Sequence, residues 1–166
     1  MNSNEKTDLK EIVFALNTCI ETCTDGEKGY AMAAADVRSP TLKELFLSRS
    51  LERADFVSAL QQATRDLHAV PENQGSPRGA LHRGWVGLRK VLEGQSDLLV
   101  VEEVTRGEEA ALNAYQEAMC HALSGKLPSA VQELLQTQSA AISSAIADLR
   151  SHAVQHRAAS ASENPQ

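Results

Sequence analysis

The sequence of 166 residues is poor in aromatic side chains, which make up 4% of it, and it has only five prolines and nine glycines. Its three cysteines are an odd and small number, which argues against a disulfide framework and favours a reducing compartment. No run of about 18 apolar residues occurs, and the chain begins with the polar stretch MNSNEKTD, so we expect neither a membrane span nor a signal peptide. The net charge of -6 argues against binding to nucleic acid or to an anionic membrane surface. We therefore expect a cytoplasmic protein.

The residues that are abundant favour helix. The chain holds 24 alanines and 19 leucines, and its 42% hydrophobic and 23% charged content is typical of a globular domain. The length suits one domain. Because the end RAASASENPQ is rich in alanine and serine without apolar periodicity, we predict a single domain over residues 1–157 and a disordered tail over 158–166.

Prolines divide the chain, since proline is costly inside a helix. Between them, apolar residues recur at steps of three or four, which predicts long helices within 7–37, 41–70, 95–124 and 129–164, the last of which frays into the tail beyond the end of its stripe at Leu149. Gly26 and Gly29 leave open a helix-turn-helix in the first segment, although the unbroken phase favours one helix. Leucines and Trp85 at helical spacing over 79–92 predict a short extra helix in the crossover between the second and third long helices. The sequence thus predicts an all-α bundle.

Several polar residues fall on the apolar stripes that should face the core. Glu27, Glu108 and Gln138 lie on the first, third and fourth stripes. The second stripe is predicted to contain Leu45, Arg49, Glu52, Phe56, Ala59, Ala63 and Leu67. An unpaired buried carboxylate costs several kcal/mol, but carboxylates that meet from facing helices are tolerated when a cation neutralises them. The alternative is that the stripe phase is wrong by one position and the glutamates lie on the flanks, paired with Arg49, Arg53 or Arg106.

A short motif, T-x-G-E, occurs at 24–27 and again at 105–108, which suggests a duplicated helix pair. With these glutamates the sequence resembles ferritin-like bundles of the rubrerythrin type, in which Gly-Glu on helices one and three supplies ligands to a di-iron centre. Together DGEKGY at 25–30, GALHRGW at 79–85 and RGEEAALNAY at 106–115 are similar to an uncharacterised bacterial family of ferritin-like four-helix-bundle proteins. That resemblance covers residues 9–150. It implies a ferritin-like antiparallel four-helix bundle with the crossover helix, and no established activity.

The sequence departs from the di-iron pattern, which requires Glu-x-x-His on helices two and four. The second segment offers Glu52-x-x-Asp55 and the fourth only Gln138-x-x-Ala141. We therefore favour a non-enzymatic structural or partner-binding protein with a degenerate carboxylate metal site. The alternative hypothesis is a protein that binds iron or another divalent metal in a redox or storage role. Its ligands would be Glu27, Glu52, Asp55 and Glu108.

Other candidates each have a second interpretation. His82 and Trp85 in the basic crossover could dock a protein partner or anchor the crossover on the bundle, and the chain could also form a homo-oligomer. Cys19 and Cys23, one turn apart, could form a redox pair, but core packing is the better interpretation. The pair formed by His152 and His156 could hold a divalent ion or simply complement the dipole of a helix end. Since no nucleophile motif or phosphate-binding loop occurs, catalysis would have to be metal-based.

Overall fold

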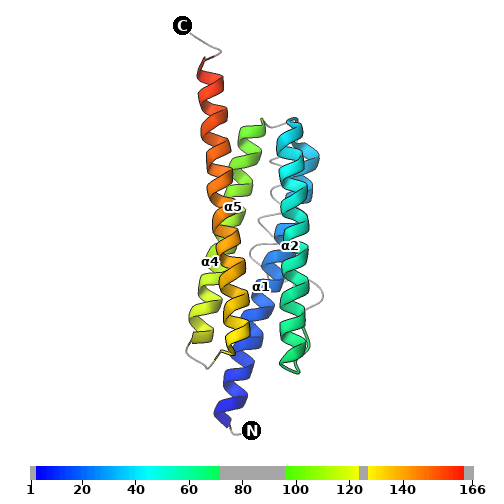
Figure 1. Cartoon of the computed structure of the whole chain (residues 1–166), viewed down its shortest axis with the longest axis vertical. Helices are drawn as coiled ribbons and strands as arrows, with labels where there is room; N and C mark the ends of the chain where they lie inside the picture. The colour runs from blue at the N-terminus through cyan, green and yellow to red at the C-terminus, as the bar shows by residue number, and fades with distance from the viewer. Residues whose placement is uncertain (1–2, 72–95, 124–126, 163–166) are drawn as a thin grey trace.

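The computed structural model describes residues 3–71, 96–123 and 127–162 (Figure 1). These residues form four long helices, α1 (Ser3–Asp36), α2 (Pro40–Asp66), α4 (Asp97–Leu123) and α5 (Ser129–Ser162), and contain no strand. The predicted all-α bundle is therefore confirmed. α1 continues without a break through Gly26 and Gly29, so the prediction of one long helix also holds. The predicted crossover helix over 79–92 lies outside the described residues.

The helices lie side by side in an up-down-down-up order (Figure 1). α1 packs against α2 and α4, whereas α5 packs against α4 and, with fewer close approaches, against α2. α2 and α4 are therefore diagonal partners that face each other across the bundle interior. α1 and α5, with 34 residues each, project past the others at opposite ends of the bundle (Figure 1). α5 runs to Ser162, beyond residue 157, where we expected the domain to end; the alanines in this stretch favour helix.

At one end of the bundle the first residue of α4 fixes the turn between α1 and α2. The Asp97 carboxylate accepts hydrogen bonds from the backbone N–H groups of Arg38 and Ser39, both at 2.8 Å. Ser39 caps α2, because its Oγ accepts from the backbone N–H of Leu42 at 3.4 Å, and Pro40 occupies the first turn. The helix predicted within 41–70 therefore begins at the proline that precedes this segment.

The buried face of α2 differs by one position from the predicted stripe. The buried residues are Leu42, Phe46, Ser50, Arg53, Leu60 and Thr64, whereas every residue of the predicted stripe is only half-buried. The prediction was wrong because both phases of this helix combine apolar and charged residues, so periodicity alone does not separate them. The small hydroxyls on the true face are satisfied by backbone: Ser50 donates to the carbonyl of Glu27 at 2.8 Å. On α5, by contrast, every residue of the predicted stripe from Val131 to Leu149 is buried, Gln138 included.

The buried apolar side chains of the described residues form two clusters along the bundle. One includes Leu16, Leu60, Tyr115, Leu135 and Ile142, and the other includes Tyr30, Phe46, Val104 and Leu149. Arg53 and Glu108 are buried between the two clusters. The core therefore consists of two apolar layers with a charged layer between them. In the part of the chain described here, no helix is long and apolar enough to span a membrane.

Candidate functional site

The charged layer is built around Arg53, whose side chain is 1% exposed and reaches from α2 to Glu108 on the diagonal helix α4. Nη2 of Arg53 donates to Oε2 of Glu108 at 2.6 Å, and Nε donates to Oε1 at 3.3 Å. Both carboxylate oxygens are therefore engaged by one guanidinium. Such a paired geometry is stronger than a single charged contact and fixes the orientation of both groups.

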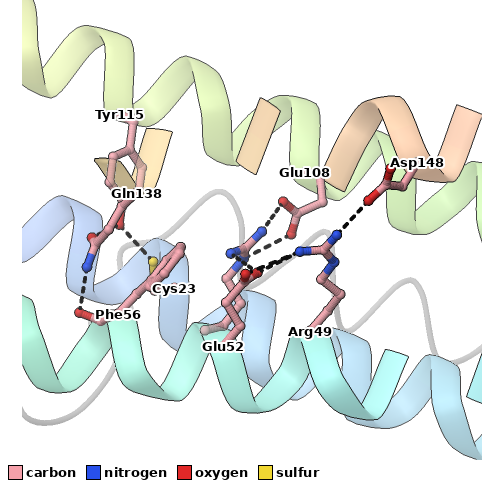
Figure 2. A network of polar contacts seen from close by, with 9 residues as sticks. Cys23, Arg49, Glu52, Phe56, Glu108, Tyr115, Gln138 and Asp148 are labelled. Carbon is pink, nitrogen blue, oxygen red and sulfur yellow. Dashed lines mark hydrogen bonds and ion pairs between the residues drawn. The ribbon is translucent and has the colours of Figure 1, made fainter. Parts of the chain in front are cut away.

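A series of side chains with alternating positive and negative charge leads from this pair to the surface. Nη1 of Arg53 donates to Glu52 at 3.0 Å, and Glu52 also accepts from Arg49 at 3.2 Å. Arg49 in turn contacts Asp148 on α5 at 2.7 Å (Figure 2). The Arg53 side chain is 1% exposed, whereas the outer members are partly or fully exposed, with 30% for Glu52, 19% for Arg49 and 51% for Asp148. Water screens the partly exposed pairs that involve Arg49. We therefore expect that breaking the Arg53–Glu108 pair lowers the free energy of unfolding more than breaking any of the outer pairs.

The aliphatic part of the Arg53 side chain lies against α1 at Gly26. A Cβ at Gly26 would be 3.5 Å from Cγ and Cδ of Arg53, which is ordinary van der Waals contact. The guanidinium carbon is 4.9 Å from the ring centroid of Phe56 and 6.0 Å from that of Tyr30, so both rings offer a cation–π contact. The surrounding residues leave no space for a water molecule beside the pair. Arg53 is thus surrounded by the rings of Tyr30 and Phe56 and by the carboxylates of Glu108 and Glu52.

Arg53 keeps its charge in this environment. Burial lowers the pKa of the guanidinium, but the charge of Glu108 and its hydrogen bonds outweigh burial and leave the pKa above its ordinary value. The layer therefore contains a permanent cation that the chain supplies itself.

A second, uncharged network lies next to the pair. The hydroxyl of Tyr115 on α4 donates to Oε1 of Gln138 on α5 at 2.6 Å, and Nε2 of Gln138 donates to the carbonyl of Phe56 at 3.3 Å (Figure 2). Sγ of Cys23 on α1 is 3.0 Å from the Tyr115 hydroxyl. Because the single proton of that hydroxyl goes to Gln138, the thiol is the donor to Tyr115. The network thus joins all four described helices and satisfies the buried amide.

The structure brings together two of the four predicted site residues. Glu108 is buried and Glu52 half-buried, and both contact Arg53. Glu27 is half-buried on α1 and Asp55 is exposed on α2. Within the described ranges, no three His, Cys, Asp or Glu side chains are arranged so that they could hold a metal ion. Metal binding by the four residues stays a prediction. Sequence reasoning considered Arg53 only as a flank partner and missed its burial, which the alternative phase of α2 would have indicated.

Comparison with known proteins identifies the family. Residues 11–121 match the family described as a domain of unknown function, DUF2383, which is more than half of the chain. The chain belongs to this family. A solved structure described as ferritin like, diiron-carboxylate proteins from Bacillus anthracis str. Ames is similar, with a TM-score of 0.59 and 17% identity over 93% of this chain and 96% of that one. This likeness shows the ferritin-like bundle fold that the sequence predicts. No curated protein matches the sequence.

The residues that this DUF2383 chain places in its centre do not fit a di-iron site. Helical di-iron proteins supply Glu from two helices and Glu-x-x-His from the other two. Here both oxygens of Glu108 are bound by Arg53, and Gln138 is engaged by Tyr115 and the Phe56 carbonyl. A metal ion at Glu108 would meet a fixed positive charge within hydrogen-bond distance of the same carboxylate. The Glu108 carboxylate, engaged in this way, fits a buried arginine better than a pair of metal ions.

The two cysteines of α1 are buried in the core, as the packing interpretation predicted, with Cys19 at 0% and Cys23 at 1% exposure. Burial raises the pKa of the Cys23 thiol to about 12, although the positive charge of Arg53 opposes the rise. Burial, together with the nearby Cys23, also raises the pKa of Cys19. Thiolate is the reactive form, so these thiols are held in their unreactive state at neutral pH.

We expect the protein to lose stability as the pH rises above 9. In the unfolded chain the thiols ionise near their ordinary pKa of about 8.5, while in the folded chain both pKa values are raised. Between these values the unfolded state releases protons that the folded state retains, so the free energy of unfolding falls with pH. The expected slope is about 1 kcal/mol per pH unit for each thiol. Urea unfolding at pH 7, 9 and 10 measures it; an equal slope in a Cys19→Ala/Cys23→Ala variant would contradict the assignment.

Proposed function

We propose that this protein is a non-enzymatic ferritin-like bundle that acts as a structural or partner-binding protein in the cytoplasm. In this proposal the Arg53 guanidinium takes the role that metal ions have in di-iron bundles, namely neutralising carboxylates at the centre. The observation that carries the proposal is the bidentate contact between Arg53 and Glu108, in which a permanent cation occupies both oxygens of the buried carboxylate.

The chemistry of an arginine supports an inert centre. A metal site with catalytic activity keeps a coordination position open for water or substrate. A guanidinium has no acceptor and does not give up its proton at physiological pH, so it offers neither a Lewis acid nor a base. The residues around the pair also leave no space for water. An interior of this kind holds helices together and leaves interaction with other molecules to the surface.

Two expectations about partners remain part of this proposal. His82 and Trp85, predicted as a docking site for a protein partner, lie outside the described residues. Self-association is likewise untested. Partner docking and self-association depend on the surface of the bundle and not on the charged layer. If either expectation fails, the proposed role of the Arg53–Glu108 pair is unaffected.

Metal titration tests the proposal. Protein without a histidine tag is titrated with Fe(II) under anaerobic conditions, and separately with Mn(II) and Zn(II), in the wild type and in Glu108→Gln. We expect no binding that depends on Glu108, because the ion would have to displace Arg53. A parallel Glu27→Gln/Asp55→Asn variant changes only partly or fully exposed members of the predicted set and should fold normally. Stoichiometric Fe(II) binding lost in either variant would instead support the iron-binding alternative.

A further inference from the structure

A cavity of about 250 Å³ lies at the end of the bundle where the α1–α2 turn, the start of α4 and the later part of α5 meet. Its apolar lining residues are Leu42, Leu98, Val101 and Ala153. Its polar lining residues are Ser39, Asp97, His152, Gln155 and His156. The cavity is separate from the Arg53 layer, because its lining does not include Arg53 or Glu108 and its apolar residues belong to the cluster that also contains Tyr30 and Phe46.

Two imidazoles border this one cavity. His152 and His156 are four residues apart on α5, a spacing that places side chains on one face of a helix one turn apart. The helix continues to Ser162, so His152 lies well before the last turn. Interaction with the helix dipole falls off within the last turn, and it does not account for this histidine. Both histidines line the same cavity, and this shared position is the observation that bears on their role.

We infer that this cavity binds one divalent transition-metal ion through His152 and His156. Imidazole nitrogen is a preferred ligand of Zn²⁺, Ni²⁺ and Cu²⁺, and two histidines at i and i+4 can chelate one ion. Each ring uses one nitrogen for the metal and keeps the other for a hydrogen bond. The inference concerns a site separate from the charged layer and does not rest on the proposed function.

The remaining coordination positions of the ion belong to water or a small ligand in the cavity. No third His, Cys, Asp or Glu of the described residues joins the pair in a metal-binding arrangement. Asp97 lines the cavity, but its carboxylate is held by the N–H groups of Arg38 and Ser39. It retains lone pairs, so it can accept a hydrogen bond from metal-bound water. The apolar lining residues would favour a small ligand with an apolar part over bulk water.

Calorimetric titration of tag-free protein with Zn(II), repeated with Ni(II), tests the inference. We expect one ion per chain, and affinity at least about tenfold weaker in His152→Asn/His156→Asn. Because His156 is exposed and His152 only partly buried, the variant should fold, which circular dichroism checks. Two matched controls remove other metal-binding side chains: His68→Asn, an exposed histidine whose φ of 57° asparagine tolerates, and Cys120→Ser, an exposed cysteine.

The controls separate this inference from the proposed function. Binding that is lost in the histidine pair variant and kept in His68→Asn, Cys120→Ser and Glu108→Gln supports the site at the bundle end. Binding that survives in the histidine pair variant, or no binding by the wild type, overturns it. Loss in Glu108→Gln alone would place the ion in the charged layer, which overturns both the inference and the proposed function.

Discussion

Replacing Glu108 with alanine is expected to lower the free energy of unfolding by about 3–5 kcal/mol. The change leaves Arg53, 1% exposed, as a buried cation whose remaining anionic contact is the half-buried Glu52. Removing one partner of a buried ion pair is costly because the other charge stays desolvated without compensation. Urea unfolding followed by circular dichroism at pH 7 measures the loss. A loss below about 1 kcal/mol would show that Arg53 finds solvent or another partner, and would contradict the enclosed geometry.

Two variants serve as controls for this prediction. Glu52→Ala removes the outer, 30% exposed carboxylate and should cost no more than about 1 kcal/mol, because water screens that pair. Arg53→Met/Glu108→Leu removes both buried charges and should recover most of the stability lost in Glu108→Ala. A buried ion pair can often be replaced by apolar residues of similar volume without net loss. If the double variant is as unstable as Glu108→Ala, the pair has a role beyond mutual neutralisation.

Replacing Gln138 with leucine is expected to cost about 1–3 kcal/mol. Leucine has a similar volume, so packing changes little, but the Tyr115 hydroxyl loses the acceptor that it contacts at 2.6 Å. That hydroxyl lies in the core on a residue with 0% exposure, so water cannot replace the acceptor without local rearrangement. The hydroxyl is left with the weakly accepting sulfur of Cys23 at 3.0 Å, and the Phe56 carbonyl loses its donor, so the cost is that of weakened buried hydrogen bonding. The measurement is again urea unfolding.

The matched control lies on the same helix. Gln136→Leu changes an exposed glutamine of α5 and should alter stability by less than about 0.5 kcal/mol. In Tyr115→Phe/Gln138→Leu both partners are apolar, and most of the loss should be recovered. Equal losses for Gln136→Leu and Gln138→Leu would mean that leucine in α5 is itself unfavourable and that the hydrogen bond contributes little.

The two variants test different layers of one interior. Glu108 belongs to the charged layer, and Gln138 to the neutral network, and the two meet at Phe56, whose carbonyl accepts from Gln138 and whose ring lies 4.9 Å from the guanidinium carbon of Arg53. Changes in contact through shared partners are not additive. We expect the combined Glu108→Ala/Gln138→Leu variant to lose less than the sum of the single losses if the two networks relax together.

Much of the architecture was predictable from local sequence. Ser39 and Pro40 signal the start of α2 and Ser96, whose Oγ accepts from the backbone N–H of Leu99, the start of α4, because capping groups and proline act within one turn. The buried face of α5 was also predictable, Gln138 included, since its apolar residues follow one clear phase. The burial of Glu108 follows from the stripe of α4 in the same way.

The tertiary structure alone decided the phase of α2 and the partner of Glu108. Apolar and charged residues occur in both phases of that helix, so local periodicity allowed either Glu52 or Arg53 to face the interior. The choice depends on what the facing helix presents: Glu108, 55 positions away in sequence and on the diagonal helix, stabilises a buried arginine and would repel a buried glutamate. Local sequence thus determined the helices and most of their buried faces. Which charges meet at the centre was determined by packing across the bundle, because electrostatic pairing depends on distance in space and not on spacing in sequence.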